Sequence, residues 1–192
     1  MDKLFYLGAD PSLRHVGLAL VNGGSATLSI NTINTGSLDI LSSVRHIRSE
    51  LEIWLRTRGV EPGTPFILGI EKQIRTGWNV GGLFAAQVAV LDAVEAYFKP
   101  TQPWAIFPFP MQLKSYMLQR HGVKNWRDKK EIIARVRSIL DYEGPLTEHE
   151  ADAYFIAHLA REVVDGTWRF DETIKRANTP LLPVTAMWRR NG

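Results

Sequence analysis

Four side chains of the kinds that ligate metal ions stand where predicted secondary-structure elements begin or end: Asp10, Glu71, His149 and Asp152. Asp10 and Glu71 each follow an apolar run typical of a strand, and His149 and Asp152 stand three residues apart at the start of a helical pattern, on one face. Carboxylates at the ends of buried strands are costly unless they are paired or bound to a metal. Several acids that converge are what two-metal hydrolysis of a phosphodiester bond requires. If the four side chains meet, we expect a nuclease.

Each of these residues also has a simpler interpretation. Asp10 begins an Asp-Pro-Ser sequence, which is frequent in turns and helix caps, and a lone histidine such as His149 is more often part of a core. Glu71 is stronger evidence because it closes a strand that is predicted to be buried on both faces. Thr147 and Glu150 form a Thr-x-x-Glu capping box, so we assign Glu150 to the helix end and not to catalysis.

The hydrophobic pattern predicts strands first and helices later. The predicted strands are 3–9, 16–21, 26–33, 66–70 and 104–107, and the predicted helices are 38–58, 80–98, 111–120, 128–140 and 148–165. A turn at Asn22-Gly23-Gly24 indicates a hairpin between the second and third strands. This order predicts one α/β domain over residues 1–165, with a mixed five-stranded sheet and helices on both faces, followed by a C-terminal extension over residues 166–192.

Composition is compatible with a nucleic-acid partner and argues against a disulfide-bonded protein, a thiolate zinc protein and a membrane-spanning protein. The chain has 192 residues and a net charge of +3, and it contains no cysteine, which rules out disulfides and thiolate zinc sites. Between residues 111 and 137 there are eight basic residues and two acidic ones, with two aromatic residues among them, as in a nucleic-acid-binding surface. The alternative is an ordinary solvated pair of helices. We see no membrane span and no signal peptide, and we expect a cytoplasmic protein.

Several short motifs follow one another along the chain. Residues 8–17 read Gly-Ala-Asp-Pro-Ser-Leu-Arg-His-Val-Gly, residues 70–73 read Ile-Glu-Lys-Gln, and residues 151–158 read Ala-Asp-Ala-Tyr-Phe-Ile-Ala-His. They resemble the opening Gly-Ile-Asp-Pro-Gly-Ser-Arg motif, the Ile-Glu-Gln strand end and the closing Ala-Asp-Ala motif of the RuvC-like Holliday junction resolvases. That family belongs to the ribonuclease H-like nuclease superfamily. The resemblance covers about residues 3–160 and implies a ribonuclease H-like fold.

The resemblance implies a role for each matched residue. Asp10 would bridge two divalent cations, Glu71 would hold one of them, and Asp152 with His149 would hold the other, unless His149 is a base for the attacking water. The ions would be two Mg²⁺, which oxygen-rich sites suit, and Mn²⁺ would substitute. Because a neutral histidine brings no negative charge and its protonation opposes metal binding, we expect activity to rise between about pH 6 and 8. Lys114 and Lys129 match basic positions that contact DNA phosphate.

The resemblance also implies a substrate and an assembly. We expect a homodimer that cuts a four-way DNA junction and leaves 5′-phosphate and 3′-hydroxyl ends, since two symmetric sites suit two symmetric strands. A less selective nuclease of branched DNA and a non-catalytic DNA-binding module remain alternatives. Where the family often has an aromatic wedge after the glutamate, this chain has Ile74, and Arg75 and Trp78 nearby are candidates to contact a base instead. Trp126 stands where the family is rich in glycine.

Overall fold

A computed structural model of the chain describes residues 4–24, 26–71, 80–168 and 185–187. Its centre is a sheet in the order β3-β2-β1-β4-β5-β6. The strands β1 (Phe5–Pro11), β2 (His15–Asn22) and β3 (Thr27–Asn34) form an antiparallel meander. The strand β4 (Pro65–Ile70) runs parallel to β1, and β5 (Lys99–Phe107) runs parallel to β4. The three-residue strand β6 (Thr185–Met187) pairs antiparallel with β5.

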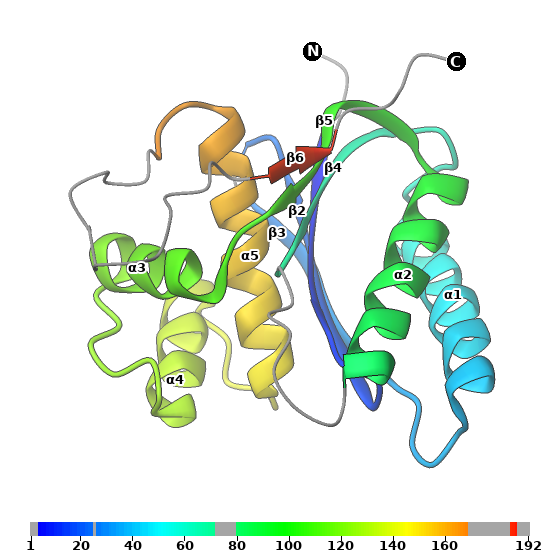
Figure 1. The fold of residues 1–192 in the computed structure, drawn as a ribbon. Coiled ribbons are helices and arrows are strands. Elements are labelled where there is room, and N and C mark those ends of the chain that lie inside the picture. Colours follow the sequence, from blue (N-terminus) through cyan, green and yellow to red (C-terminus); the bar gives the residue numbers. More distant parts are fainter. Residues whose placement is uncertain (1–3, 25, 72–79, 169–184, 188–192) are drawn as a thin grey trace.

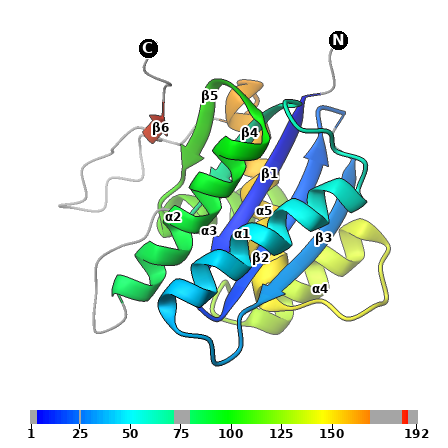
Figure 2. The same cartoon turned by 90° about the vertical axis from the view of Figure 1, so that its right-hand side faces the viewer.

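Helices cover both faces of this sheet. Helices α1 (Ile40–Thr57) and α2 (Val80–Tyr97) lie side by side on one face, as Figures 1 and 2 show. Helix α5 (Glu148–Val164) crosses the other face and packs on β1, β2 and β4. Helices α3 (Pro110–His121) and α4 (Lys129–Leu140) pack against α5. None of the helices in the described ranges is long and apolar enough to cross a membrane.

The alternation of side chains along the strands divides the core in two. Leu7 and Ala9 of β1 belong to the cluster under α1 and α2, whereas Tyr6 belongs to the cluster under α5. In the same way Leu18 and Ala19 of β2 point to opposite clusters, as the two-residue period of a strand requires. The central strands are therefore buried on both faces, which explains why β4 reads as a continuous apolar run.

The predicted α/β fold class is confirmed, with all five predicted strands and all five predicted helices present. The hairpin at residues 22–24 is present as predicted. Two details differ from the prediction. Strand β5 begins at Lys99, five residues before the predicted start at 104, and the sheet gains β6 as a sixth strand. Residues 185–187 lie in the predicted C-terminal extension, so this part of the extension joins the sheet through pairs such as Ala105 with Met187.

Candidate active site

Two of the predicted acids come together because the first and fourth strands are parallel neighbours. Asp10 is the second-last residue of β1, and Glu71 directly follows β4. Ala9 pairs with Ile70 in the parallel ladder, so Asp10 and Glu71 each stand one residue further along adjacent strands. The carboxyl ends of parallel strands meet at one edge of the sheet, and that edge brings the two carboxylates together.

Glycines allow helix α5 to approach this edge closely. A Cβ atom on Gly17 would overlap the backbone carbonyl of His149, and a Cβ atom on Gly8 would overlap that of Ala153. A Cβ atom on Gly69 would crowd Ile156. The three strands β1, β2 and β4 thus each present a glycine to α5, whose first turns carry the other two candidate residues.

The start of α5 is fixed by the predicted capping box. The Thr147 hydroxyl accepts a hydrogen bond from the backbone N–H of Glu150 at 3.2 Å, and the Glu150 carboxylate accepts one from the N–H of Thr147 at 2.7 Å. Glu150 is thereby committed to the helix end, as the sequence indicated. The capping box therefore fixes the residue at which α5 begins, just before His149 and Asp152.

Two pairings define the centre of the site. His149 Nδ1 lies 2.7 Å from Asp10 Oδ2, and the His149 ring stacks on that of His15 with centroids 5.6 Å apart. Lys129 Nζ donates to Asp152 Oδ2 at 3.0 Å. Although His149 and Asp152 stand on one face of the helix, as predicted, each has a different partner in the structure. The side chains of Asp10 and Asp152 are 15% and 18% exposed, so each remains accessible from one side.

The electrostatics of the site are those of crowded, partly desolvated acids. Burial raises the pKa of Glu71 to about 7, and the charges of Asp10 and Asp152 add to this. Burial and the charge of Asp10 raise the pKa of Asp152 to about 6, although Lys129 and His149 act in the opposite direction. The hydrogen bond to Asp10 raises the pKa of His149 in spite of burial. Perturbed acids that act on one another in this way are typical of functional sites.

Two predicted DNA-contacting lysines border these acids. Burial acts to lower the pKa of Lys129, but Asp152, Glu148 and Asp10 outweigh it and the pKa is raised. Burial lowers the pKa of Lys114, and the charge of Glu71 opposes this change. The other predicted DNA-contacting residues, Ile74, Arg75 and Trp78, lie outside the described residues.

The donor set fits a divalent metal ion in its chemistry. Carboxylate oxygens with one imidazole suit Mg²⁺ and Mn²⁺, and a cation among these acids would relieve the repulsion that raises the pKa of Glu71 and of Asp152. Among the residues that the structure describes, no group of three or more His, Asp or Glu side chains is arranged to hold one ion. The partners of Asp10 and Asp152 are instead His149 and Lys129. Metal binding by these residues stays a prediction.

Some features of the site were not found from the sequence. The pairing of Lys129 with Asp152 joins residues 23 apart and depends on how α4 docks. His15 was missed, although its position at the start of β2, two residues before Gly17, placed it near the end of β1. His158, further along α5, has a structural role, because it is buried, lies 3.2 Å from the Thr27 hydroxyl, and has its pKa lowered to about 4 by burial.

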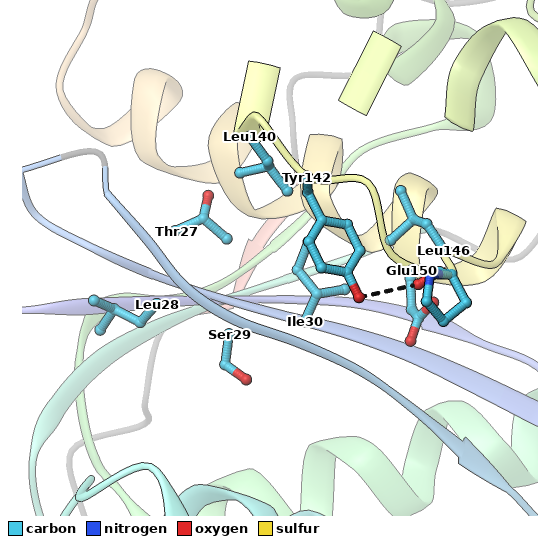
Figure 3. Close-up of a pocket in the computed structure, with 9 residues that line it drawn as sticks. Thr27, Leu28, Ser29, Ile30, Leu140, Tyr142, Leu146 and Glu150 are labelled. Atoms are coloured by element: carbon cyan, nitrogen blue, oxygen red, sulfur yellow. Dashed lines mark hydrogen bonds between the residues drawn. The ribbon is translucent and has the colours of Figure 1, made fainter. Parts of the chain in front are cut away.

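A cavity of about 310 Å³ lies outside this site, between β3 and the connection from α4 to α5. Figure 3 shows its lining, in which Tyr142 donates a hydrogen bond to the Pro145 carbonyl at 3.4 Å. The acidic side chain in the lining is Glu150, which caps α5. The cavity therefore offers no uncommitted acid for catalysis.

Comparison with solved structures identifies the fold. A structure of RuvC from T. thermophilus in complex with a Holliday junction substrate shares 24% sequence identity with this chain, with a TM-score of 0.62. A second Thermus thermophilus RuvC structure shares 27% identity, with a TM-score of 0.60. Each match covers 85% of this chain and 97% of the RuvC chain. No protein-family model and no curated protein matches the sequence. The protein has a RuvC-like, ribonuclease H-like fold.

Proposed function

We propose that this protein is a metal-dependent endonuclease that hydrolyses phosphodiester bonds in branched DNA and resolves four-way junctions. The observation that carries the proposal is the convergence of Asp10, Glu71, His149 and Asp152 at one edge of a RuvC-like sheet, with Lys114 and Lys129 beside them. The RuvC chain of similar fold in complex with a Holliday junction supports the choice of substrate.

The four residues would hold two Mg²⁺ ions, or Mn²⁺ in their place. Bound there, the ions would lower the pKa of an attacking water and stabilise negative charge on the leaving 3′-oxygen, so that the products carry 5′-phosphate and 3′-hydroxyl ends. Asp10 and Glu71 would be ligands from the ends of two adjacent strands. Asp152 would exchange its contact with Lys129 for the metal. His149, held by Asp10, would be a further ligand or would accept the proton of the water.

The two lysines would act on the DNA. Released from Asp152, the Lys129 ammonium would contact a phosphate and neutralise charge beside the cleaved bond. Lys114, whose charge acts on Glu71, would contact a neighbouring phosphate. The basic stretch around both lysines gives the surface on which the negatively charged backbone would lie.

We also propose that the active form is a cytoplasmic homodimer. Phe84 and Val88 of α2 are 62% and 43% exposed, and their spacing of four residues puts them on one side of the helix. Two neighbouring apolar side chains on one exposed helix face would suit a contact with a second copy of the chain. A two-fold dimer would offer one site to each of the two symmetric strands of a junction.

The test is incubation of the protein with a synthetic four-way junction, a replication fork and a linear duplex, each with Mg²⁺. We expect paired symmetric nicks in the junction, no cutting after Asp10→Asn, and unchanged cutting after Glu150→Gln, which keeps the capping interaction. Solution mass should correspond to a dimer. Equal cutting of all three substrates would replace the resolvase by a less selective nuclease. Binding without metal-dependent cutting would leave a DNA-binding module.

A further inference from the structure

The connection between α3 and α4 holds a tryptophan against one of the two lysines. Lys114 Nζ lies 3.5 Å from the centroid of the Trp126 ring, and the guanidinium carbon of Arg127 lies 5.0 Å from it. An ammonium at this distance over an indole is attracted by the negative face of the ring. Trp126 is half-buried, so its ring is not part of the core.

The backbone that carries Trp126 is fixed from several sides. The Glu131 carboxylate accepts hydrogen bonds from the backbone N–H groups of Lys124 at 2.6 Å and Asn125 at 3.2 Å. Val123 is buried, and its N–H donates to the carbonyl of Met117 at 3.1 Å. The connection is therefore anchored to both α3 and α4, and the indole has a defined position.

Lys114 needs such a support because a lysine side chain has four rotatable bonds and loses considerable entropy when it is held in place. The two acids that act on its charge are Glu71 and Asp152, both in the candidate site, whereas Lys129 and Arg127 repel it. Without the ring, the ammonium would be free to move away from the repelling cations and from the site. With the ring, one position is favoured before DNA arrives.

We propose that Trp126 is a positioning residue that holds the Lys114 ammonium beside the acidic site, ready to contact a DNA phosphate next to the cleaved bond. This inference rests on the proposed nuclease function. It assigns Trp126 no direct contact with the DNA and makes its effect depend on Lys114.

A double-mutant cycle tests this dependence, with Lys114→Gln, Trp126→Leu, the double variant and Trp126→Phe. In single-turnover cleavage of a junction, Lys114→Gln should slow the reaction about 10- to 100-fold, as for loss of a charged hydrogen bond. Trp126→Leu should slow it about 3- to 30-fold, the range of a cation–π contact, and Trp126→Phe should retain most of the rate. The double variant should be no slower than Lys114→Gln, because the tryptophan acts through the lysine.

Salt dependence of junction binding in Ca²⁺ gives a second measurement. Lys114→Gln and Trp126→Leu should each lower the slope of log K against log salt concentration by up to about 1, whereas a purely structural tryptophan would leave it unchanged. Arg45→Gln is the matched control, since Arg45 is an exposed cation on α1, on the opposite face of the sheet. It should leave the cleavage rate unchanged.

The outcomes separate this inference from the function on which it rests. Absence of metal-dependent cutting by the unaltered protein would remove the proposed function. Cutting with additive losses in the double variant would show that Trp126 acts independently of Lys114 and would overturn the inference alone. A direct check needs no DNA: in the NMR spectrum the Lys114 ε-methylene protons should be shifted upfield by the ring and should return to ordinary values in Trp126→Leu. An unshifted Lys114 signal in the unaltered protein would also overturn the inference.

Discussion

Replacement of Glu71 by glutamine should stabilise the metal-free protein while it abolishes cleavage. The Glu71 carboxylate is partly desolvated and is repelled by Asp10 and Asp152, and these effects raise its pKa from 4.5 to about 7. A raised pKa means that the folded state binds the proton more tightly than the unfolded state does. The contribution of Glu71 to stability is therefore fully present below its unfolded pKa of 4.5 and is lost as the pH rises through about 7.

The magnitude follows from the two pKa values. At pH 8 ionisation of Glu71 favours the unfolded state by about 3 kcal/mol, and at pH 5 by about 1 kcal/mol. Glutamine has a similar shape and no charge, so its own burial cost is the same at every pH. The difference in unfolding free energy between Glu71→Gln and the unaltered protein should thus increase by about 2 kcal/mol from pH 5 to pH 8.

The measurement is urea unfolding of both proteins at several pH values in EDTA. The difference in melting temperature between the variant and the unaltered protein should likewise increase by about 4–8 °C from pH 5 to pH 8. Addition of Mg²⁺ at pH 8 should stabilise the unaltered protein and have less effect on the variant, because an ion that binds the folded state shifts the equilibrium toward it. Parallel stability profiles for the two proteins across this pH range would refute the reasoning.

Three further predictions concern the other parts of the site. Gly17→Ala should lower the unfolding free energy, measured by chemical unfolding, by about 3 kcal/mol or more and should impair cleavage, because the new methyl group meets the His149 carbonyl. Gly81→Ala is the control, since Gly81 of α2 has open space around it, and it should change the unfolding free energy by at most about 1 kcal/mol. Lys129→Gln should bind Mn²⁺ more tightly than the unaltered protein in titration calorimetry without DNA, because the Lys129 ammonium and the ion compete for Asp152. An unchanged affinity for Mn²⁺ would show that the ion does not displace Lys129 from Asp152. The cleavage rate at saturating metal should rise between about pH 6 and 8 as His149, whose pKa is raised by Asp10, loses its proton; a flat profile would argue against its direct role.

The sequence predicted the ends of elements better than the pairing of side chains. Asp10 and Glu71 could be placed at strand ends because each closes an apolar run, and the capping box could be read from Thr147 and Glu150. These signals are local, and local patterns of period and turn chemistry survive in the fold. The partners of His149 and Asp152 could not be read in this way, because they lie 139 and 23 residues away along the chain.

The strand β6 shows a similar limit. Three residues that pair with β5 add a strand from a segment whose own sequence has too short a pattern to predict one. Strand pairing of this kind is decided by the free edge of a neighbouring strand and not by intrinsic preference alone. The Lys114–Trp126 contact likewise arises only when the connection from α3 to α4 is folded.

By itself the sequence determined the α/β class, the order of the elements and the acids that end them, since hydrophobic period and turn residues act over short distances. Only the tertiary structure decided which side chains of the site contact one another. The parallel pairing of β1 with β4 set Asp10 beside Glu71, and glycines on three strands let α5 bring His149 to Asp10. The docking of α4 placed Lys129 on Asp152. The resulting charges depend on burial and on distances through space, which the order of residues along a chain does not specify.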